Sequence, residues 1–307
     1  MTLPIDTNSP IETATTSATG RRVLLIVNAR SRQGADAARD AERLLVERGL
    51  MVLPRECVDR ADMGNLIRGH AGEVDGVVIG GGDGTINAAA LALAETGLPL
   101  GILPLGTAND LARTLELPVD IAGAADVIAA GRIRTVDLGM VNGHPFFNVA
   151  SLGLSVDLTR ELTPERKRRW GKLGYALATI RVLSRARAFR AEIIADGETY
   201  RVKTVQIAVG NGRYYGAGLT VEERATIDDG KFDVYSLEVR HPWHLALIYP
   251  AFRLGRQGRW SDVRTITCEQ VEIRTSRSRS INTDGELTVR TPAKFTLRRQ
   301  AVRVYAP

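Results

Sequence analysis

The feature that most constrains the fold is a glycine-rich run, Gly80-Gly81-Gly82-Asp83-Gly84-Thr85-Ile86-Asn87, which directly follows the apolar stretch 77–79. When a buried strand passes through glycines into a helix, backbone N–H groups can approach a polyphosphate because no Cβ atoms obstruct them. The run therefore predicts a phosphate-binding turn between a strand and a helix. An aspartate there would repel bare phosphate, so Asp83 indicates a bound cation or a polarising role.

Short apolar stretches and helical patterns alternate on both sides of this run. Strands are predicted at 21–28, 51–53, 75–79 and 100–103, and helices at 34–49, 63–70 and 87–95. Such alternation is typical of a parallel sheet with helices on its faces. A second unusual loop, Pro104-Leu105-Gly106-Thr107-Ala108-Asn109-Asp110, follows the last of these strands. Both loops are therefore expected at carboxyl ends of strands, in one cleft.

From about residue 135 the pattern changes to period-2 segments separated by turn signals. They lie at 146–149, 191–195, 201–209, 232–239, 263–273 and 295–304. This alternation indicates antiparallel strands. The sequence thus predicts an α/β plus all-β protein, in which a doubly wound α/β nucleotide-binding domain precedes an antiparallel β-sandwich. We expect a flexible tail at 1–20, the α/β domain at 21–140 and a β-rich domain at 141–307.

Two motifs together resemble the diacylglycerol kinase catalytic superfamily, in particular the bacterial lipid kinases related to sphingosine and ceramide kinases. Gly81-Gly82-Asp83-Gly84-Thr85 is similar to their nucleotide loop. NAD kinases and phosphofructokinases have a comparable loop, so this motif alone does not choose among them. The second motif, Pro104-x-Gly106-Thr107-x-Asn109-Asp110, favours the lipid kinases. The resemblance covers residues 21 to 305 and implies an ATP-dependent lipid kinase that requires Mg²⁺ and whose β-rich domain, 141–307, binds the lipid substrate.

The resemblance implies a nucleotide site that three segments build. These are Asn28, Ala29, Arg30, Ser31 and Arg32 after the first strand; Gly81, Gly82, Asp83, Gly84, Thr85, Ile86 and Asn87 in the glycine loop; and Thr107. It also implies that Asp83, Asp110 and Asp137 form an acidic network near the catalytic Mg²⁺, partly through water. Phosphoryl transfer needs such a cation, and Mg²⁺ prefers carboxylates together with retained waters. Taken singly, each residue also has an ordinary interpretation: Asp110 could compensate the positive charge of a helix N-terminus, and Asp137 could be a surface aspartate at the end of a strand.

A further acidic turn, Asp228-Asp229-Gly230-Lys231, resembles the family's second, structural metal site. The resemblance implies that the metal ligands are the Asp229 carboxylate and the backbone carbonyls of Thr226 and Lys231. A plain hairpin turn is the competing interpretation, because Asp-Gly is a strong turn signal by itself. The sequence leaves both interpretations open.

The late segment Asn282-Thr283-Asp284-Gly285-Glu286 resembles the family's last acidic motif, whose glutamate acts as general base on the lipid hydroxyl. The resemblance therefore implies that Glu286 is catalytic together with Asp83, and it leaves open which of the two accepts the proton. The same tripeptide occurs at Asp196-Gly197-Glu198, where a hairpin turn explains it. Only its position, after the β-domain strands, distinguishes Glu286.

The net charge of +6 is concentrated in residues 160–190, where ten Lys and Arg face only Glu161 and Glu165. Arg166-Lys167-Arg168-Arg169-Trp170 is followed there by apolar residues at helical spacing. A solvated helix face is the ordinary interpretation of such a segment. Because a lipid kinase must take its substrate from a bilayer, we expect segment 160–190 to meet the lipid substrate at the membrane surface.

The chain has two cysteines, Cys57 and Cys268, without a metal-binding spacing, and no run of about 18 apolar residues. We therefore expect a cytoplasmic protein that associates peripherally with membranes and has no nucleic-acid partner. A homodimer stays open. Two other functions also stay open: a soluble-metabolite kinase of the NAD kinase type, and a basic membrane- or polyanion-binding module whose nucleotide site is degenerate. The sequence does not indicate which lipid is the acceptor.

Overall fold

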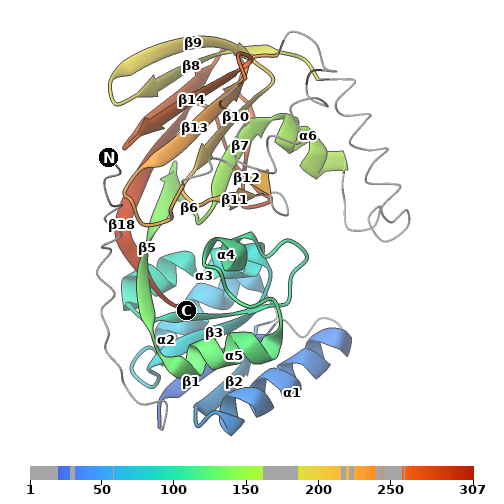
Figure 1. Ribbon diagram of the computed structural model, residues 1–307, viewed down its shortest axis with the longest axis vertical. Helices are drawn as coiled ribbons and strands as arrows, with labels where there is room; N and C mark the ends of the chain where they lie inside the picture. The colour runs from blue at the N-terminus through green and yellow to red at the C-terminus, as the bar shows by residue number, and fades with distance from the viewer. Residues whose placement is uncertain are drawn as a thin grey trace, which may run out of the picture.

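The computed structural model describes residues 20–27, 32–57, 59–161, 186–215, 219–220, 225–239, 244, 258 and 260–307. Figure 1 shows an α/β part below and a β-rich part above it. The predicted tail, nucleotide residues Asn28 to Ser31 and most of the basic segment lie outside the described residues. Within the described ranges, no helix has the length and hydropathy needed to cross a membrane.

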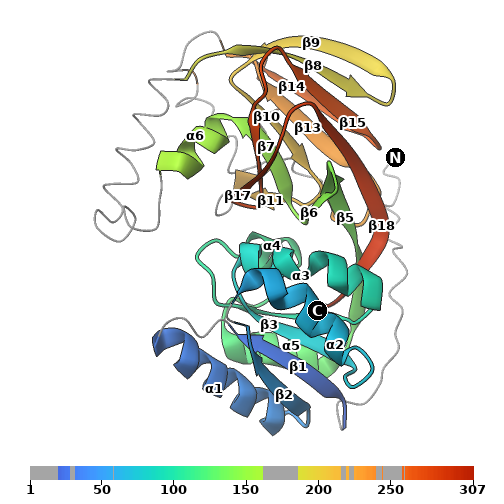
Figure 2. The same ribbon diagram turned by 180° about the vertical axis from the view of Figure 1, so that it is seen from behind.

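The α/β part is built on four parallel strands in the order β2-β1-β3-β4. The strands are β1 (Arg22–Val27), β2 (Met51–Glu56), β3 (Gly76–Gly81) and β4 (Leu100–Pro104). The helical elements are α1 (Arg32–Glu47), η1 (Arg60–Asp62, a 3-10 helix), α2 (Met63–His70), α3 (Asp83–Thr96), α4 (Asp110–Thr114) and α5 (Ile121–Ala130). Figure 2 shows α2 and α3 on one side of the sheet, and α1 and α5 lie on the other.

The alternation of side chains along β1 explains this double winding. Leu24 and Ile26 belong to one apolar cluster with residues of α2 and α3. Val23 and Leu25 belong to a second cluster with residues of α1 and α5. Because successive side chains of a strand point to opposite faces, a fully apolar strand needs a helix layer on both sides. The predicted doubly wound fold is confirmed.

The β-rich part contains a six-stranded antiparallel sheet in the order β14-β13-β10-β7-β16-β17. Its strands are β7 (Val149–Gly153), β10 (Gln206–Gly210), β13 (Phe232–Leu237), β14 (Val263–Cys268), β16 (Ser280–Thr283) and β17 (Glu286–Arg290). The opposing layer consists of β5 (Ile133–Val141), β6 (His144–Phe146), β8 (Phe189–Ala195), β9 (Glu198–Thr204), β15 (Val271–Thr275) and β18 (Ala293–Tyr305). Phe146 and Phe295 from one layer meet Phe232 from the other in a buried core, which confirms the β-sandwich.

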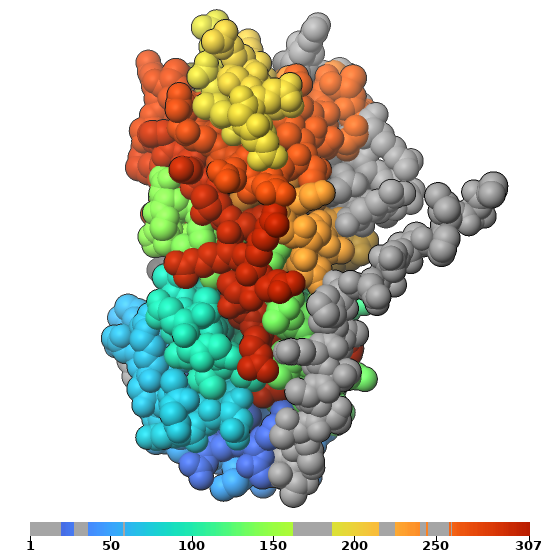
Figure 3. All heavy atoms as spheres, turned by 90° about the vertical axis from the view of Figure 1, so that its left-hand side faces the viewer, coloured from blue at the N-terminus to red at the C-terminus, as the bar shows by residue number. Residues whose placement is uncertain are grey.

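Strand β18 joins the two parts of the molecule. Its first half pairs antiparallel with β15 and β5, and Val304 near its end pairs parallel with Leu100 of β4. Figure 3 shows these C-terminal residues running from the β-rich part onto the α/β part. The end of the chain thus completes the first sheet. The remaining elements are α6 (Leu154–Glu161) and the small ribbon of β11 (Tyr214–Tyr215) and β12 (Leu219–Thr220).

Two strands predicted as single segments are each divided between the two layers. Residues 201–209 form the end of β9 and most of β10, and residues 263–273 span β14 and the start of β15. Thus β9 and β15 belong to the large mixed sheet, whereas β10 and β14 belong to the six-stranded sheet. Both layers send alternate side chains into the same core. The period-2 pattern therefore continues where the chain passes from one layer to the other, and the sequence alone does not reveal that change of layer.

Candidate active site

The glycine loop leads from β3 into α3, as the sequence predicts. Gly82 is the N-cap residue of α3, and its carbonyl accepts hydrogen bonds from the backbone N–H groups of Thr85 and Ile86. The earlier N–H groups of the helix have no intrahelical acceptor and lie at the positive end of the helix dipole. The Thr85 side chain is buried against Gly81. A Cβ added to Gly81 would lie 2.8 Å from the Cβ of Thr85. The exposed part of this turn is therefore backbone, which suits an anion.

The loop after β4 packs directly against the glycine loop. A Cβ on Gly106 would collide with the Cα of Gly82, and a Cβ on Gly82 would lie 3.1 Å from the Cα of Gly106. Asn109 holds this second loop in shape, because its side chain accepts a hydrogen bond from Gly106 N (2.9 Å) and donates to Pro104 O (3.2 Å). Thr107, which belongs to this second loop, is exposed. The two predicted loops therefore form one surface, as expected from their strand ends.

Asp83 links the helices that begin at these loops. Its Oδ1 accepts a hydrogen bond from the backbone N–H of Leu111 in α4 (3.0 Å), and no described residue donates to its Oδ2. Asp110 begins α4 and is 7% exposed. The two aspartates of the motifs thus both lie in first helical turns, and Asp83 keeps one carboxylate oxygen available at the joint surface.

The β16–β17 hairpin delivers the late acidic motif to the same place. Asp284 and Gly285 form its turn with positive φ angles of 46° and 96°. The Asp284 carboxylate accepts hydrogen bonds from the backbone N–H groups of Phe147 (2.7 Å), Asn148 (3.0 Å) and Val149 (3.0 Å). Asp284 thereby fixes the hairpin to the start of β7. This aspartate is a site residue that the sequence motif contains but did not single out.

Asp284 and Asp83 are close enough to influence each other. Burial, together with the smaller effect of the negative charge of Asp83, raises the pKa of the Asp284 carboxyl from 3.8 to about 7, against the effect of the three N–H donors. A buried carboxyl group whose ionisation is made costlier by a neighbouring carboxylate favours a cation beside it. The pair is therefore chemically suited to the neighbourhood of a divalent metal.

The variant Asp284→Asn is expected to change the pH dependence of stability. Because the folded-state pKa of about 7 lies above the ordinary 3.8, the folded chain binds this proton more tightly than the unfolded chain. Stability from Asp284 is therefore lost as the pH rises through this interval. The wild type should lose on the order of 2 kcal/mol between about pH 5 and pH 8 that the variant does not lose. Urea unfolding across this window tests this, and a pH-independent difference between the proteins would contradict it.

Glu286 lies against the first turn of α3. A Cβ on Gly84 would be 2.6 Å from Glu286 Oε1 and 2.9 Å from Arg60 Nη1, so the glycine leaves room for both side chains in their present positions. Arg60 of η1 forms an ion pair with the Glu286 carboxylate, and about half of each side chain is exposed. The structure thus brings together the residues predicted as catalytic, Asp83 and Glu286. It adds Arg60, which the sequence reasoning missed.

The variant Arg60→Gln is expected to lower kcat several-fold with little change in melting temperature. An ion pair between half-exposed side chains contributes less than about 1 kcal/mol to stability. Its loss, however, frees the side chain of Glu286, the predicted general base, to leave the first turn of α3, and small misplacements of a reacting group are costly to rate. Steady-state kinetics alongside thermal unfolding measure both effects. A variant with unchanged kcat would show that Arg60 does not position Glu286.

Asp137 lies with the predicted second metal turn. Its carboxylate is 1% exposed and accepts hydrogen bonds from the backbone N–H groups of Gly230 (2.8 Å) and Gln300 (2.7 Å). These bonds tie β5 to the turn before β13 and to the irregular part of β18. The structure thus gives Asp137 a structural role. No described hydrogen bond or ion pair joins Asp137 to Asp83, and its place in the acidic network near Mg²⁺ stays a prediction.

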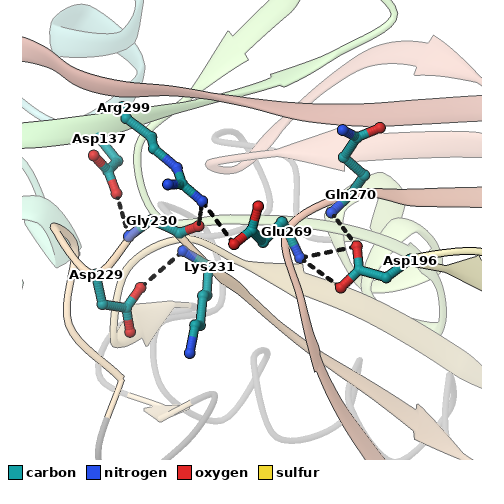
Figure 4. Close-up of polar contacts among 8 residues, drawn as sticks. All are labelled: Asp137, Asp196, Asp229, Gly230, Lys231, Glu269, Gln270 and Arg299. Atoms are coloured by element: carbon teal, nitrogen blue, oxygen red, sulfur yellow. Dashed lines mark hydrogen bonds and ion pairs between the residues drawn. The ribbon is translucent and has the colours of Figure 1, made fainter.

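Figure 4 shows how the turn around Gly230 is held. Lys231 N donates to Asp229 Oδ1 (3.0 Å), and Arg299 donates to Gly230 O (3.2 Å) while pairing with Glu269. Burial raises the pKa of Asp229, and the carboxylates of Asp233 and Asp137 add to it. The turn is not a hairpin between paired strands, since β13 pairs with β10 and β14 and β12 pairs with β11.

Within the described ranges, no three His, Cys, Asp or Glu side chains gather as a ready metal site. The metal at Thr226, Asp229 and Lys231 therefore stays a prediction. At the two loops, the residues do fit a metal-bound nucleotide, because such a complex brings its own phosphate oxygens and waters as ligands. The free Oδ2 of Asp83 and the glycine-to-glycine approach at Gly82 and Gly106 are the observations that support this fit.

Three other residues that were predicted to bind the nucleotide lie in different surroundings. Ile86 is buried in the α/β core, and Asn87 donates from its side-chain amide to Pro145 O (3.2 Å) in β6. Arg32 begins α1, although its side chain is outside the described part. The nucleotide contacts of these residues stay predictions.

Comparison with protein families identifies the class of protein that this site belongs to. Residues 22–141 match the diacylglycerol kinase catalytic domain, and residues 148–306 match the YegS C-terminal NAD kinase beta sandwich-like domain. The chain therefore belongs to the lipid kinase family of YegS-like and diacylglycerol kinase-like proteins.

Individual relatives agree with this family. A probable YegS-like lipid kinase of Pectobacterium atrosepticum is 32% identical over 86% of this chain and 88% of its own length. A diacylglycerol kinase of Bacillus subtilis is 29% identical over 76% and 78% of the two chains. The crystal structure of a diacylglycerol kinase from Bacillus anthracis superposes with a TM-score of 0.77 and 28% identity, covering 94% of this chain and 97% of that one.

Proposed function

We propose that this chain is an ATP-dependent kinase that transfers the γ-phosphoryl group to a hydroxyl group of a diacylglycerol-like lipid. The observation that carries the proposal is the position of Glu286 against Gly84. It places a carboxylate from the β-rich part beside the helix N-terminus that suits nucleotide phosphates. A base and a phosphate-binding turn within one site are the two elements that phosphoryl transfer to an alcohol requires.

The residues of this site can divide the reaction among them. Backbone N–H groups at the start of α3 bind the phosphates and orient the γ-phosphorus toward the β-rich part. Glu286 accepts the proton of the lipid hydroxyl as the new O–P bond forms and the bond to the β-phosphate oxygen breaks, so that ADP leaves. Arg60 holds the Glu286 carboxylate in place until the hydroxyl arrives.

Asp83 and Asp110 in the two loops, with Asp284 in the turn between β16 and β17, would hold the magnesium ion near the phosphates. When bound, Mg²⁺ neutralises charge on the β- and γ-oxygens. Glu286 is proposed as the proton acceptor in preference to Asp83, because Asp83 lies in the first turn of α3, at the turn proposed to bind the phosphates, whereas Glu286 comes from the opposite part of the molecule. Glu286 lies on the side of the site that the β-rich part contributes.

The substrate is expected to reach this site from a membrane surface. The segment 160–190 supplies eight more positive than negative charges. We propose peripheral attachment of a cytoplasmic protein through this segment, because each nearby Lys or Arg adds about 1 kcal/mol of attraction to an anionic leaflet.

Incubation with labelled ATP, Mg²⁺ and a panel of lipid vesicles tests the proposed function. A labelled lipid that forms only in the presence of both ATP and vesicles supports it, and mass spectrometry of that product identifies the acceptor. Labelled NADP formed from NAD without vesicles would instead show a soluble-metabolite kinase. Salt-sensitive vesicle binding without ATP turnover would show a binding module.

A further inference from the structure

A polar hollow lies in the β-rich part, and none of its lining residues belongs to the two glycine loops. It has a volume of about 130 Å³, which equals several water molecules at about 30 Å³ each. Its lining comes from α6, from the segment before β16 and from the end of β17. The lining residues are Gly153, Val156, Asp157, Arg160, Ser278, Arg279, Ser280 and Arg290. The hollow is therefore large enough for a tetrahedral oxyanion with some of its water.

Three arginines and one aspartate give the lining a net charge of +2. Arg160 Nη2 and Arg290 Nη1 both donate to the same hydroxyl, Ser280 Oγ, each at 3.0 Å. Arg290 also donates from Nε to Ser278 Oγ (3.1 Å) and from Nη2 to Ser278 O (2.9 Å). Two guanidinium groups are thus fixed side by side on neutral oxygens. Their mutual repulsion is unfavourable unless an anion joins them.

Arg279 supplies the third positive group in a different way. Its guanidinium lies over the ring of Phe189, 3.9 Å from the ring centroid, and none of the described residues accepts a hydrogen bond from it. Burial lowers the pKa of Arg279, which reflects the cost of removing its charge from water. Stacking on an aromatic ring leaves the edge of a guanidinium group, with its N–H donors, available to an oxyanion.

The hollow is linked to the active site along one strand. Glu286 begins β17 and Arg290 ends it, so the two are separated by about 13 Å at the usual rise of ~3.3 Å per residue. On the paired strand, Ser280 lies opposite Arg290 and Thr283 opposite Glu286. Asn282 between them donates to Thr159 of α6 (2.6 Å). Hairpin and helix thus form one unit, with the proposed base at one end and the arginines at the other.

We propose that this hollow binds a phosphate group of an anionic ligand, separately from the phosphates of the nucleotide. Arginine guanidinium groups recognise phosphate oxygens by paired, charge-assisted hydrogen bonds, and the serine hydroxyls add neutral donors. The phosphate belongs either to a lipid headgroup in the membrane that presents the substrate or to a soluble phosphorylated molecule. This inference does not depend on catalysis, because binding at the hollow is measured without nucleotide.

The test uses the full chain and two ligands. One arm titrates inorganic phosphate by calorimetry, and the other measures co-sedimentation with phosphatidylcholine vesicles that contain or lack phosphatidic acid. The double variant Arg160→Gln/Arg279→Gln is expected to bind about tenfold more weakly in at least one arm, since each charge-assisted hydrogen bond is worth about 1.5–3 kcal/mol. Loss in the vesicle arm alone assigns the site to lipid headgroups, and loss with inorganic phosphate assigns it to soluble phosphates.

The matched control is Arg201→Gln/Arg274→Gln, which removes the same charge at exposed side chains of β9 and β15. Ser280→Asp is a second variant that keeps all three arginines and fills the hollow with a carboxylate, so it should lose binding as well. Thermal unfolding verifies that each variant is folded. The proposal is overturned if the hollow variants and the control bind phosphate and vesicles equally well.

Discussion

Replacement of Asp83 by asparagine is expected to lower kcat by about a thousandfold or more while the protein stays folded. The asparagine Oδ1 can still accept the hydrogen bond that Leu111 N donates to Asp83 Oδ1, so the junction of α3 and α4 is retained. What the variant loses is the negative charge beside the phosphate-binding turn. If that charge holds the metal on the transferring phosphoryl group, rate falls and folding does not.

Asp120→Asn is the control for this substitution. Asp120 is the N-cap of α5, and its carboxylate also accepts a backbone N–H, from Gly123 at 2.8 Å. Asparagine caps helices about as well as aspartate, so this variant should keep both stability and kcat. Rates with labelled ATP and lipid vesicles, and thermal unfolding of both variants, give the comparison. Near-normal turnover by the Asp83 variant would remove Asp83 from the chemistry.

The sequence predicted the α/β part well because its signals are local. The apolar run Val77 to Ile79 is buried on both sides, and the helix 63–70 has the predicted bounds. The placement of both loops at strand ends followed from the parallel topology alone. The helices α4 and α5 were not predicted: α4 has only five residues, whereas α5 carries local signals that could have found it, an N-cap at Asp120 and a C-cap at Gly131. Short helices depend on packing that a local pattern does not contain.

The site residues that sequence reasoning missed depend on contacts between distant parts of the chain. Arg60 and Glu286 are 226 positions apart, and Asp284 holds backbone N–H groups about 135 positions earlier. Nothing near Arg60 in the sequence indicates a partner. The Asp-Gly pair at 284–285 has the same turn geometry as that at 196–197, where Asp196 holds the N–H groups of Glu269 and Gln270. The two turns have similar φ angles, but the folded chain places different segments against them: the start of β7 against Asp284, and residues 269 and 270 against Asp196.

This repeated turn provides the control for the second large expected effect. Glu286→Gln should lower kcat by about 10²- to 10⁴-fold, the usual contribution of a positioned general base. Glutamine has the same shape and can remain beside Arg60 and Gly84, but its amide cannot take a proton from the lipid hydroxyl. The KM for ATP should change little, because the backbone groups that bind phosphates stay in place.

Glu198→Gln is the matched variant, because Glu198 follows an Asp-Gly turn with φ angles of 46° and 88°, close to those before Glu286. It lies on β9, at the edge of the large mixed sheet and separated from β4 by three strands, and accepts a hydrogen bond from the Tyr200 hydroxyl. Its kcat should equal that of the wild type. If Glu286→Gln also keeps its turnover while Asp83→Asn does not, Glu286 is not the proton acceptor and Asp83 is the remaining candidate. In that case Glu286 and Arg60 serve as a contact that joins the β-rich part to the first turn of α3.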